Sequence, residues 1–532
     1  MKITKILILS ILFPILFSSC TDDDLDTIMY GSREDSDYYK NMTEINEGLT
    51  SCYYFMKQLW NDMSLELLFI NDCGTDDCDK GGGGYTDQIE ISQYETGNIF
   101  ATNSRVSKFW SMSYRSIYEI NKLLDKIAAY RTSHPELSDD DKNLLTRYEN
   151  EARWLRGMWY FNLVYLWGDV PLFLHPENPS AIYKPRTPAA QVWEQIIQDF
   201  TAATALPKRS EYPAEDLGRV TSGAAYAMLG RTYWFLHDYE NAYKALNVLV
   251  EGEQKGEYEL DPDFATQWLN PNSNVRESIF EIQYYSDGGN WELSSGWPGV
   301  WTLPVCDGGY AFHVPTAQLK EAFDPNDPRL TWTFIEQGDK FVGNDYATIQ
   351  DAFPNRMFDR KHFMPKGERQ QQDITENDLP MTVYIIRYAD VLLMYSETCL
   401  EKGDLTNAKK YLNQVRQRAR QSSTLDPKRE IQMNIPEVTS NTLPDITTTD
   451  AEELRHAIWN ERRCEFACEG LRRLDLVQQG RLVEVMTDYY NKNVLKENPD
   501  KGRYYTNEKV LFPIPQTEID YSQGALVQNP GY

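Results

Sequence analysis

The residues best suited to binding a ligand lie in a loop at positions 291–310. Trp291, Trp297 and Trp301 stand close together among Gly, Pro and Ser, and Tyr310 follows them. A flat aromatic ring matches the apolar C–H face of a sugar, where dispersion and desolvation provide the attraction. The sequence therefore predicts Trp297 and Trp301 as the main stacking rings, with Trp291 and Tyr310 beside them. The alternative is a loop that its own tryptophans attach to the protein interior, because buried Trp is common.

A second candidate site is the acidic, glycine-rich segment 71–85. Asp and Asn side chains accept hydrogen bonds from sugar hydroxyls, and the run of four glycines at 81–84 lets the backbone approach a ligand closely. Asp77 and Tyr85 are the candidate contacts here, with Tyr85 as a further stacking ring. Two alternatives stay open: a solvated acidic loop, or a calcium site. The spacing of the acids does not match an EF-hand.

The charged run 461–475 needs a different interpretation. Glu461, Glu465 and Glu469 are spaced by four, as on one face of a helix. Paired carboxylates can act in catalysis, but the interleaved arginines favour a structural ion-pair network. The motifs HExxH, GxSxG, GxxxxGK[ST] and a strand-led GxGxxG do not occur. The motifs therefore point to no catalytic residue and no cofactor. A glycosidase carboxylate pair stays open, because its members need not be close in sequence.

Cysteine and histidine usage gives little sign of a metal site. The chain has 8 cysteines, and 8 − 1 = 7 remain once Cys20 is assigned to a leader, so they cannot all pair. Cys73 and Cys78 are near enough in sequence to bridge. Cys464 and Cys468 fit a buried face of a predicted helix. Because there is no CxxC pair and the 6 histidines are scattered, no metal site is expected.

The N-terminus reads as a bacterial lipoprotein signal. Residues 1–19 carry Lys2 and Lys5 before an apolar stretch that is too short to span a bilayer. Small residues precede Cys20, as in a lipobox, so we expect Cys20 to be acylated; an ordinary signal peptide is the alternative. The net charge of −27 argues against a nucleic-acid partner and against electrostatic binding to anionic lipid.

The elements that must position these residues are mostly helices. Apolar residues recur at helical spacing over 35–59, 104–130 and 138–167, and Thr187 and Pro188 predict the start of a helix that runs to about 206. Segments near 221–251 and 386–420 share the pattern of a tetratricopeptide (TPR) helix pair. Long irregular segments at 71–100, 259–329 and 426–449 interrupt them. The prediction is a mainly α, TPR-like helical-repeat scaffold with long irregular ligand-binding loops.

Several ordered blocks resemble the SusD/RagB family of outer-membrane nutrient-binding lipoproteins of Bacteroidetes. They are EARWLRGMWYF (151–161), LWGDVPL (166–172), YIIRYADVLLMYSE (384–397), ERRCEFACEGLRR (461–473), FPIP (512–515) and NPGY (529–532). The acidic run after Cys20 is similar to the surface-export signal of such lipoproteins. Cys468 and Leu471 replace the usual Phe and His of the family block, and both changes look like changes of packing.

The resemblance implies a single SusD-like domain over 20–532, anchored by lipid in the outer membrane and exposed at the cell surface. It implies binding of a poly- or oligosaccharide and its delivery to a SusC-like TonB-dependent transporter, without chemistry of its own. Family members take ligand contacts from loops that correspond to both candidate segments. The alternatives are a receptor for a non-carbohydrate nutrient or peptide, and a glycoside hydrolase.

Overall fold

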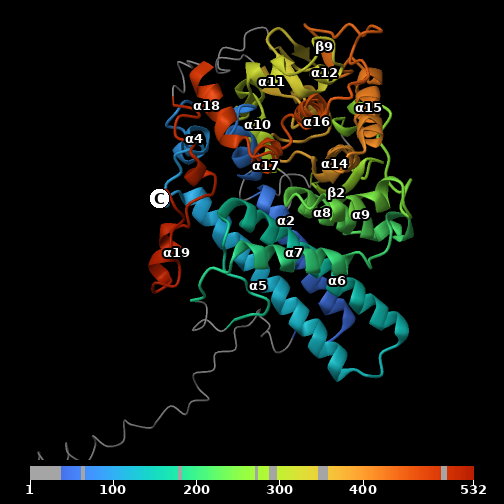
Figure 1. The fold of residues 1–532 in the computed structure, drawn as a ribbon, viewed down its shortest axis with the longest axis vertical. Helices are drawn as coiled ribbons and strands as arrows, with labels where there is room; N and C mark the ends of the chain where they lie inside the picture. The colour runs from blue at the N-terminus through green and yellow to red at the C-terminus, as the bar shows by residue number, and fades with distance from the viewer. Residues whose placement is uncertain are drawn as a thin grey trace, which may run out of the picture.

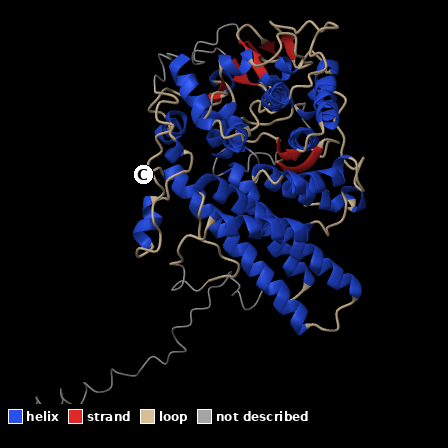
Figure 2. Ribbon diagram, in the orientation of Figure 1, coloured by secondary structure: helices blue, strands red, loops and turns tan. Residues whose placement is uncertain are grey.

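Long helices form one end of the molecule, and short strands and helices form the other (Figures 1 and 2). The computed structural model describes residues 38–61, 66–177, 183–269, 273–284, 286, 296–345, 357–492 and 500–532. Cys20, Trp291 and the side chain of Trp297 lie outside this description. Within these ranges, every helix falls short of the length and apolarity that a membrane crossing requires.

Four helices pack against one another at the helical end: α2 (Met42–Asn61), α5 (Ser104–Ser133), α6 (Asp139–Trp167) and α7 (Ala189–Ala203). Ser138 caps α6 by accepting a hydrogen bond from the Asp141 amide, as its sequence predicts. The α7 prediction was one residue out. Its N-cap is Pro188, which has no side-chain acceptor, while Thr187 pairs with Val170 in an isolated bridge.

Two helix pairs follow the TPR pattern. The first is α8 (Ser222–Phe235) with α9 (Tyr239–Val250), and the second is α14 (Tyr388–Glu401) with α15 (Leu405–Gln421). Close approach needs a small residue at the crossing: a Cβ added at Gly230 would lie 2.4 Å from the Leu246 side chain. In the second pair, Ser396 Oγ donates to the Ala408 carbonyl over 2.7 Å. The mainly helical, TPR-like scaffold is thereby confirmed.

The segments expected to be irregular contain short elements of their own. The strands of the described chain, which lie both in these segments and outside them, form antiparallel pairs: β1 (Cys78–Gly81) with β3 (Phe312–Pro315), β2 (Ser278–Gln283) with β8 (Thr382–Arg387), β4 (Phe334–Glu336) with β7 (Met357–Asp359), and β5 (Lys340–Phe341) with both β6 (Asn344–Asp345) and β9 (Arg429–Ile431).

The remaining α-helices are mostly short. They are α3 (Glu66–Leu68), α4 (Ile89–Thr96), α10 (Gly296–Thr302), α11 (Ala317–Glu321), α12 (Arg329–Thr333), α13 (Lys366–Gln371), α16 (Ala451–Glu465), α17 (Arg472–Gln478), α18 (Leu482–Lys492) and α19 (Gln516–Tyr521).

The charged run at 461–475 forms a buried ion-pair network. The Glu465 carboxylate is fully buried and contacts Arg329, Arg387 and Arg418. These arginines come from α12, β8 and α15, so the network joins elements that are far apart in sequence. The structural interpretation of the run therefore holds. The prediction of one continuous helical face was wrong, because α16 ends at Glu465 and leaves Cys468 and Glu469 beyond it.

Candidate functional site

The β1–β3 pair brings the two candidate loops together. Cys78 pairs with Pro315 and Gly81 with Phe312, so segments more than two hundred residues apart run side by side. Beyond β1, the Gly82 amide donates to the Ala311 carbonyl over 2.8 Å. A Cβ at Gly81 would lie 2.1 Å from that same carbonyl oxygen, so only glycine fits. The loops that carry Tyr85 and Tyr310 therefore leave the same end of the strand pair.

Tyr310 is exposed and rests on a buried aromatic layer. Its side chain is 46% exposed, and its ring meets Trp301 edge-on with the centroids 5.8 Å apart. Trp301 is only 9% exposed and packs against Phe69 and Phe312, at centroid separations of 5.8 and 4.8 Å. The Arg105 guanidinium lies 5.5 Å from the centre of the Trp301 ring. Trp301 therefore supports the surface from below, whereas the sequence analysis expected it to stack directly on a ligand.

Tyr85 is the second exposed ring, and its loop is fixed by its own hydrogen bonds. Its side chain is 44% exposed. Lys80 Nζ donates to the Gly84 and Asp87 carbonyls over 2.7 and 2.6 Å, and the Asp87 carboxylate accepts from the Gly83 amide. Partial burial, with Asp500 and Glu95 nearby, raises the pKa of the Tyr85 phenol. Tyr85 therefore presents a neutral hydroxyl that can both donate and accept hydrogen bonds.

Asp77 does not face the surface. Its carboxylate is buried and lies 2.7 Å from Arg463 Nε and 3.5 Å from Arg472 Nε. Asp76, next to it, contacts the same two arginines. The expectation that Asp77 accepts from a ligand must be corrected: these carboxylates anchor the 71–85 loop to α16 through Arg463 and to the start of α17 through Arg472. They already have cationic partners in the protein, which removes the reason for assigning them a calcium ion.

The cysteines of this loop are free thiols. Cys73 and Cys78 form no bridge with each other. Instead, Cys78 Sγ lies 3.9 Å from Cys468 Sγ, across 390 residues of sequence. No local spacing rule signals this proximity.

A second concave aromatic surface escaped the sequence analysis. A groove of about 520 Å³ runs between α5, the segment after α6, and α19. Its rings include Trp110, which is buried as predicted, and the exposed Tyr118, Tyr183 and Tyr521. The volume falls in the usual range for small-molecule sites. Its tyrosines come from three distant segments, so only the fold assembles them.

Family models match the chain nearly end to end. The model described as the SusD family matches residues 239–532. A second, described as starch-binding associating with outer membrane, matches residues 35–234. A tetratricopeptide repeat model matches residues 223–251, which include α8 and α9.

Curated relatives and solved structures agree with these matches. The chain is 24% identical to SusD-like protein P2 of Formosa agariphila, over 96% of both chains. It is 23% identical to a SusD-like protein of Bacteroides ovatus, over 97% of this chain and 95% of that one. A laminarin binding SusD-like protein superposes with a TM-score of 0.73 at 25% identity, over 93% of this chain and all of that chain. The surface glycan-binding protein A of Bacteroides thetaiotaomicron, in complex with laminarihexaose, superposes with a TM-score of 0.71 at 22% identity, over 92% of this chain and 99% of that chain.

Proposed function

The chain belongs to the SusD family, and on that premise we propose that it binds a poly- or oligosaccharide at the cell surface. We further propose that it delivers the glycan to a SusC-like TonB-dependent transporter in the outer membrane. In this proposal residues 1–19 are removed as a signal, Cys20 carries the lipid anchor, and the protein performs no chemistry on its ligand. The acidic net charge of −27 suits a neutral glycan better than a polyanion.

The observation that carries the proposal is the pair of exposed tyrosines at one end of the β1–β3 pair. Tyr310 stands on Trp301, and Tyr85 stands on a loop held by Lys80 and Asp87. A ring that is already held in place loses little conformational freedom when a sugar stacks on it. Gly83 is exposed, and a Cβ added at Gly84 would meet no atom within 4 Å, so open backbone lies beside Tyr85. We therefore place the glycan across Tyr85 and Tyr310, with Trp297 and Trp291 as further predicted contacts from the adjoining loop.

Laminarin is the first ligand to test, because one similar structure is described as laminarin binding and another holds laminarihexaose. The mature chain without acylation would be run in native gels that contain laminarin, starch or other plant and microbial polysaccharides. Affinity for the polymer that retards it would then be measured by titration calorimetry. We expect Tyr310→Ala and Tyr85→Ala each to weaken binding about tenfold, which corresponds to about 1.4 kcal/mol.

Two further variants make the test specific. Tyr54 of α2 is 43% exposed and lies in neither candidate surface, so Tyr54→Ala should bind as the wild type does. Tyr118→Ala removes a ring from the groove along α5. If Tyr118→Ala loses affinity while Tyr310→Ala and Tyr85→Ala keep it, the groove is the glycan site. If no polysaccharide or oligosaccharide is bound by any measure, a non-carbohydrate nutrient becomes the better proposal.

Anchoring and delivery need separate experiments. Mass spectrometry of the N-terminal peptide from native membranes should find Cys20 acylated, and Cys20→Ala should release the protein from the membrane. A tagged chain should co-purify with a TonB-dependent transporter. Retention of the Cys20→Ala variant in the membrane, or purification without a transporter, would contradict these parts of the proposal and leave glycan binding untouched.

A further inference from the structure

We propose that Asp72, Cys78, His313 and Cys468 form a closed zinc site at the β1–β3 pair. The four residues come from the turn Phe69–Cys73, from β1, from β3 and from the segment after α16. The sequence analysis expected no metal site, because these residues are scattered along the chain. The proposal rests on their geometry and burial and stands independently of glycan binding.

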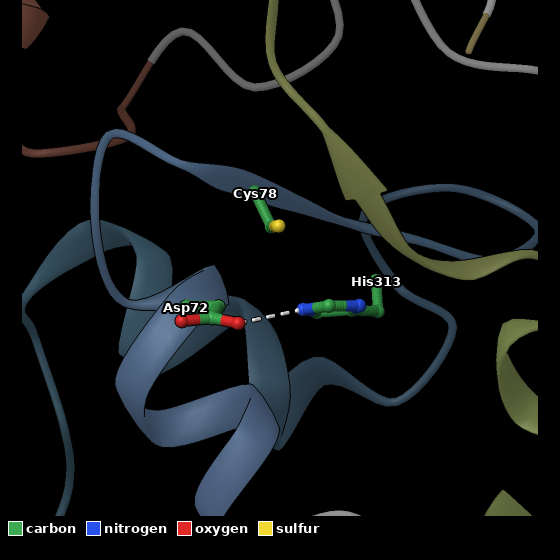
Figure 3. A group of neighbouring side chains, drawn as sticks. All are labelled: Asp72, Cys78 and His313. Atoms are coloured by element: carbon green, nitrogen blue, oxygen red, sulfur yellow. Dashed lines mark hydrogen bonds and ion pairs between the residues drawn. The ribbon is translucent and has the colours of Figure 1, made fainter. Parts of the chain in front are cut away.

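The first evidence is the convergence of the donor atoms. Figure 3 shows the side chains of Asp72, Cys78 and His313 directed toward one space. Ligand atoms of these three residues all lie within 4.8 Å of one another, and His313 Nε2 is 3.1 Å from Asp72 Oδ2. Cys468 adds a second sulfur, 3.9 Å from Cys78 Sγ. Two sulfurs, one imidazole nitrogen and one carboxylate oxygen make a donor set that suits zinc.

The two measured separations agree with the edges of a tetrahedron around zinc. Zn–S bonds of about 2.3 Å and Zn–N or Zn–O bonds of about 2.0 Å place the two sulfurs about 3.8 Å apart and the nitrogen and oxygen about 3.3 Å apart. The observed values are 3.9 and 3.1 Å. A disulfide would instead need the two sulfurs at about 2.05 Å. Each pair thus has the spacing of one tetrahedral edge, and Cys78 Sγ lies within 4.8 Å of the Asp72 and His313 ligand atoms. Binding of an ion would draw the two pairs together around it.

The second evidence is a set of partners that orient the ligands. His313 Nδ1 lies 3.1 Å from the Asp359 carboxylate, which also contacts His362 Nδ1 at 2.6 Å and accepts from the Lys361 amide. A metal-bound histidine commonly donates its other ring nitrogen to a carboxylate in this way. Asp72 Oδ2 accepts from the Gly470 amide over 2.9 Å, which holds that carboxylate toward His313.

Burial and backbone geometry indicate a structural ion. Cys78, His313 and Cys468 are 0% exposed and Asp72 is 1% exposed, so no position is open for a substrate. His313 and Cys468 both have left-handed backbone, with φ of 62° and 64°. Non-glycine residues keep this conformation where their surroundings require it. An ion here would tie β1, β3 and the segment after α16 together.

Metal binding to the mature chain tests the proposal without any substitution. The zinc content of the purified protein would be measured by inductively coupled plasma mass spectrometry. The protein would then be stripped of metal with a chelator and titrated with Co²⁺. We expect one ion per chain, tetrahedral d–d bands in the visible, and thiolate-to-cobalt charge-transfer absorption in the near ultraviolet. A titration with no charge-transfer band overturns the proposal. So does a Cys78–Cys468 disulfide that, once reduced, leaves a chain that binds neither metal.

Variants assign the ligands. Cys78→Ser should weaken the charge-transfer band, and both Cys78→Ser and His313→Gln should weaken zinc binding at least a hundredfold. Cys399→Ser removes a buried thiol elsewhere and should keep the band and the affinity. Asp359→Asn tests positioning: it should retain the cobalt spectrum while zinc affinity falls about 10–100-fold. Because Cys78→Ser can fail to fold, circular dichroism would be recorded for each variant. If that variant is unfolded, the cobalt spectrum of the wild type and the zinc affinity of Asp359→Asn decide whether the site binds metal. Equal affinity in folded Cys78→Ser and wild type overturns the assignment.

Discussion

Replacing Glu465 by Gln tests whether the buried ion-pair network holds the fold together. Glu465 is 0% exposed, and its oxygens contact Arg387 at 2.6 Å, Arg329 at 2.8 Å and Arg418. The substitution keeps the shape of the side chain and removes its charge. It also places an amide NH₂, which can only donate, against arginines that can only donate.

The expected loss of stability in Glu465→Gln follows from the balance of positive and negative charges in the buried network. Among the described residues, the connected ion pairs join five cations and five carboxylates: Arg329, Lys361, Arg387, Arg416 and Arg418 with Glu277, Asp327, Glu461, Glu465 and Glu469. Glu465→Gln leaves one buried positive charge uncompensated. Removing one partner of a buried pair costs about 3–5 kcal/mol. We expect the free energy of unfolding to fall by that amount.

Urea denaturation followed by tryptophan fluorescence would measure the loss. Glu452→Gln on the same helix is the matched control, because its carboxylate pairs with Arg455 but its side chain is 73% exposed. Exposed pairs of this kind contribute about 0–1 kcal/mol. If both variants lose the same stability, the buried charges do not stabilise the fold and the reasoning is refuted.

The pH dependence of the stability loss shows whether Glu465→Gln acts through the lost charge or through altered packing. Burial alone would raise the pKa of Glu465, but Arg418, Arg387 and Arg329 together hold it well below its usual range. Its folded pKa is therefore lower than its unfolded value of about 4.3, so its stabilisation is complete above that pH and is lost as the pH falls. The gap between wild type and Glu465→Gln should narrow below about pH 4. A gap independent of pH would assign the loss to packing.

Three further substitutions test the scaffold and the site. Gly230→Ala should lower stability in urea by about 1–3 kcal/mol, because its Cβ would lie 2.4 Å from Leu246; an unchanged midpoint would contradict close packing of the first TPR pair. Burial raises the pKa of Asp261 to about 6, and one of its buried oxygens has no hydrogen-bond partner in the described chain. Since the folded pKa of Asp261 exceeds its unfolded value, ionisation of Asp261 lowers the stability of the folded state. This loss of stability is fully present above pH 6 and absent below about pH 4. Asp261→Asn should therefore raise stability by about 1–2 kcal/mol at pH 8 and leave it unchanged at pH 4 in thermal melts. Asp77→Asn should keep glycan affinity within twofold in calorimetry, because its carboxylate faces Arg463 inside the protein; a large loss would restore it as a ligand contact.

Features set by local sequence were predictable. The start of α6 was correct because Ser138 needs only the Asp141 amide three residues on. The first TPR pair was correct because Gly230 and Ala242, twelve residues on, follow the spacing of the repeat. The ion-pair interpretation of 461–475 needed only the alternation of acids and arginines. It could not place the helix end, because the turn after Glu465 is stabilised by contacts to distant segments, including the Gly470 amide with Asp72.

The parts of the candidate site that sequence could not supply depend on pairing across long stretches of chain. Whether Trp301 faces solvent is decided by Phe69 and Phe312, which come from separate segments. The sequence around Asp77 is that of an exposed acidic loop, and it gives no sign that Arg463, 386 residues away, pairs with the Asp77 carboxylate. Cys78 and Cys468 are 390 residues apart in sequence, and only the packing of the segment after α16 against β1 brings their sulfurs to 3.9 Å.

The residues proposed to select the ligand are different from those that stabilise the fold around them. Tyr85 and Tyr310 are each more than two-fifths exposed, so substituting them removes little buried area and leaves the fold almost unchanged. By contrast, Trp301, which contacts Tyr310, and His313 are buried among partners from distant elements, and a change there disturbs several contacts at once. Selection can therefore vary the exposed rings to fit different glycans while the buried layer stays fixed. It follows that exchanging Tyr85 or Tyr310 for Trp or Phe should alter which polysaccharide binds while the denaturation midpoint hardly moves.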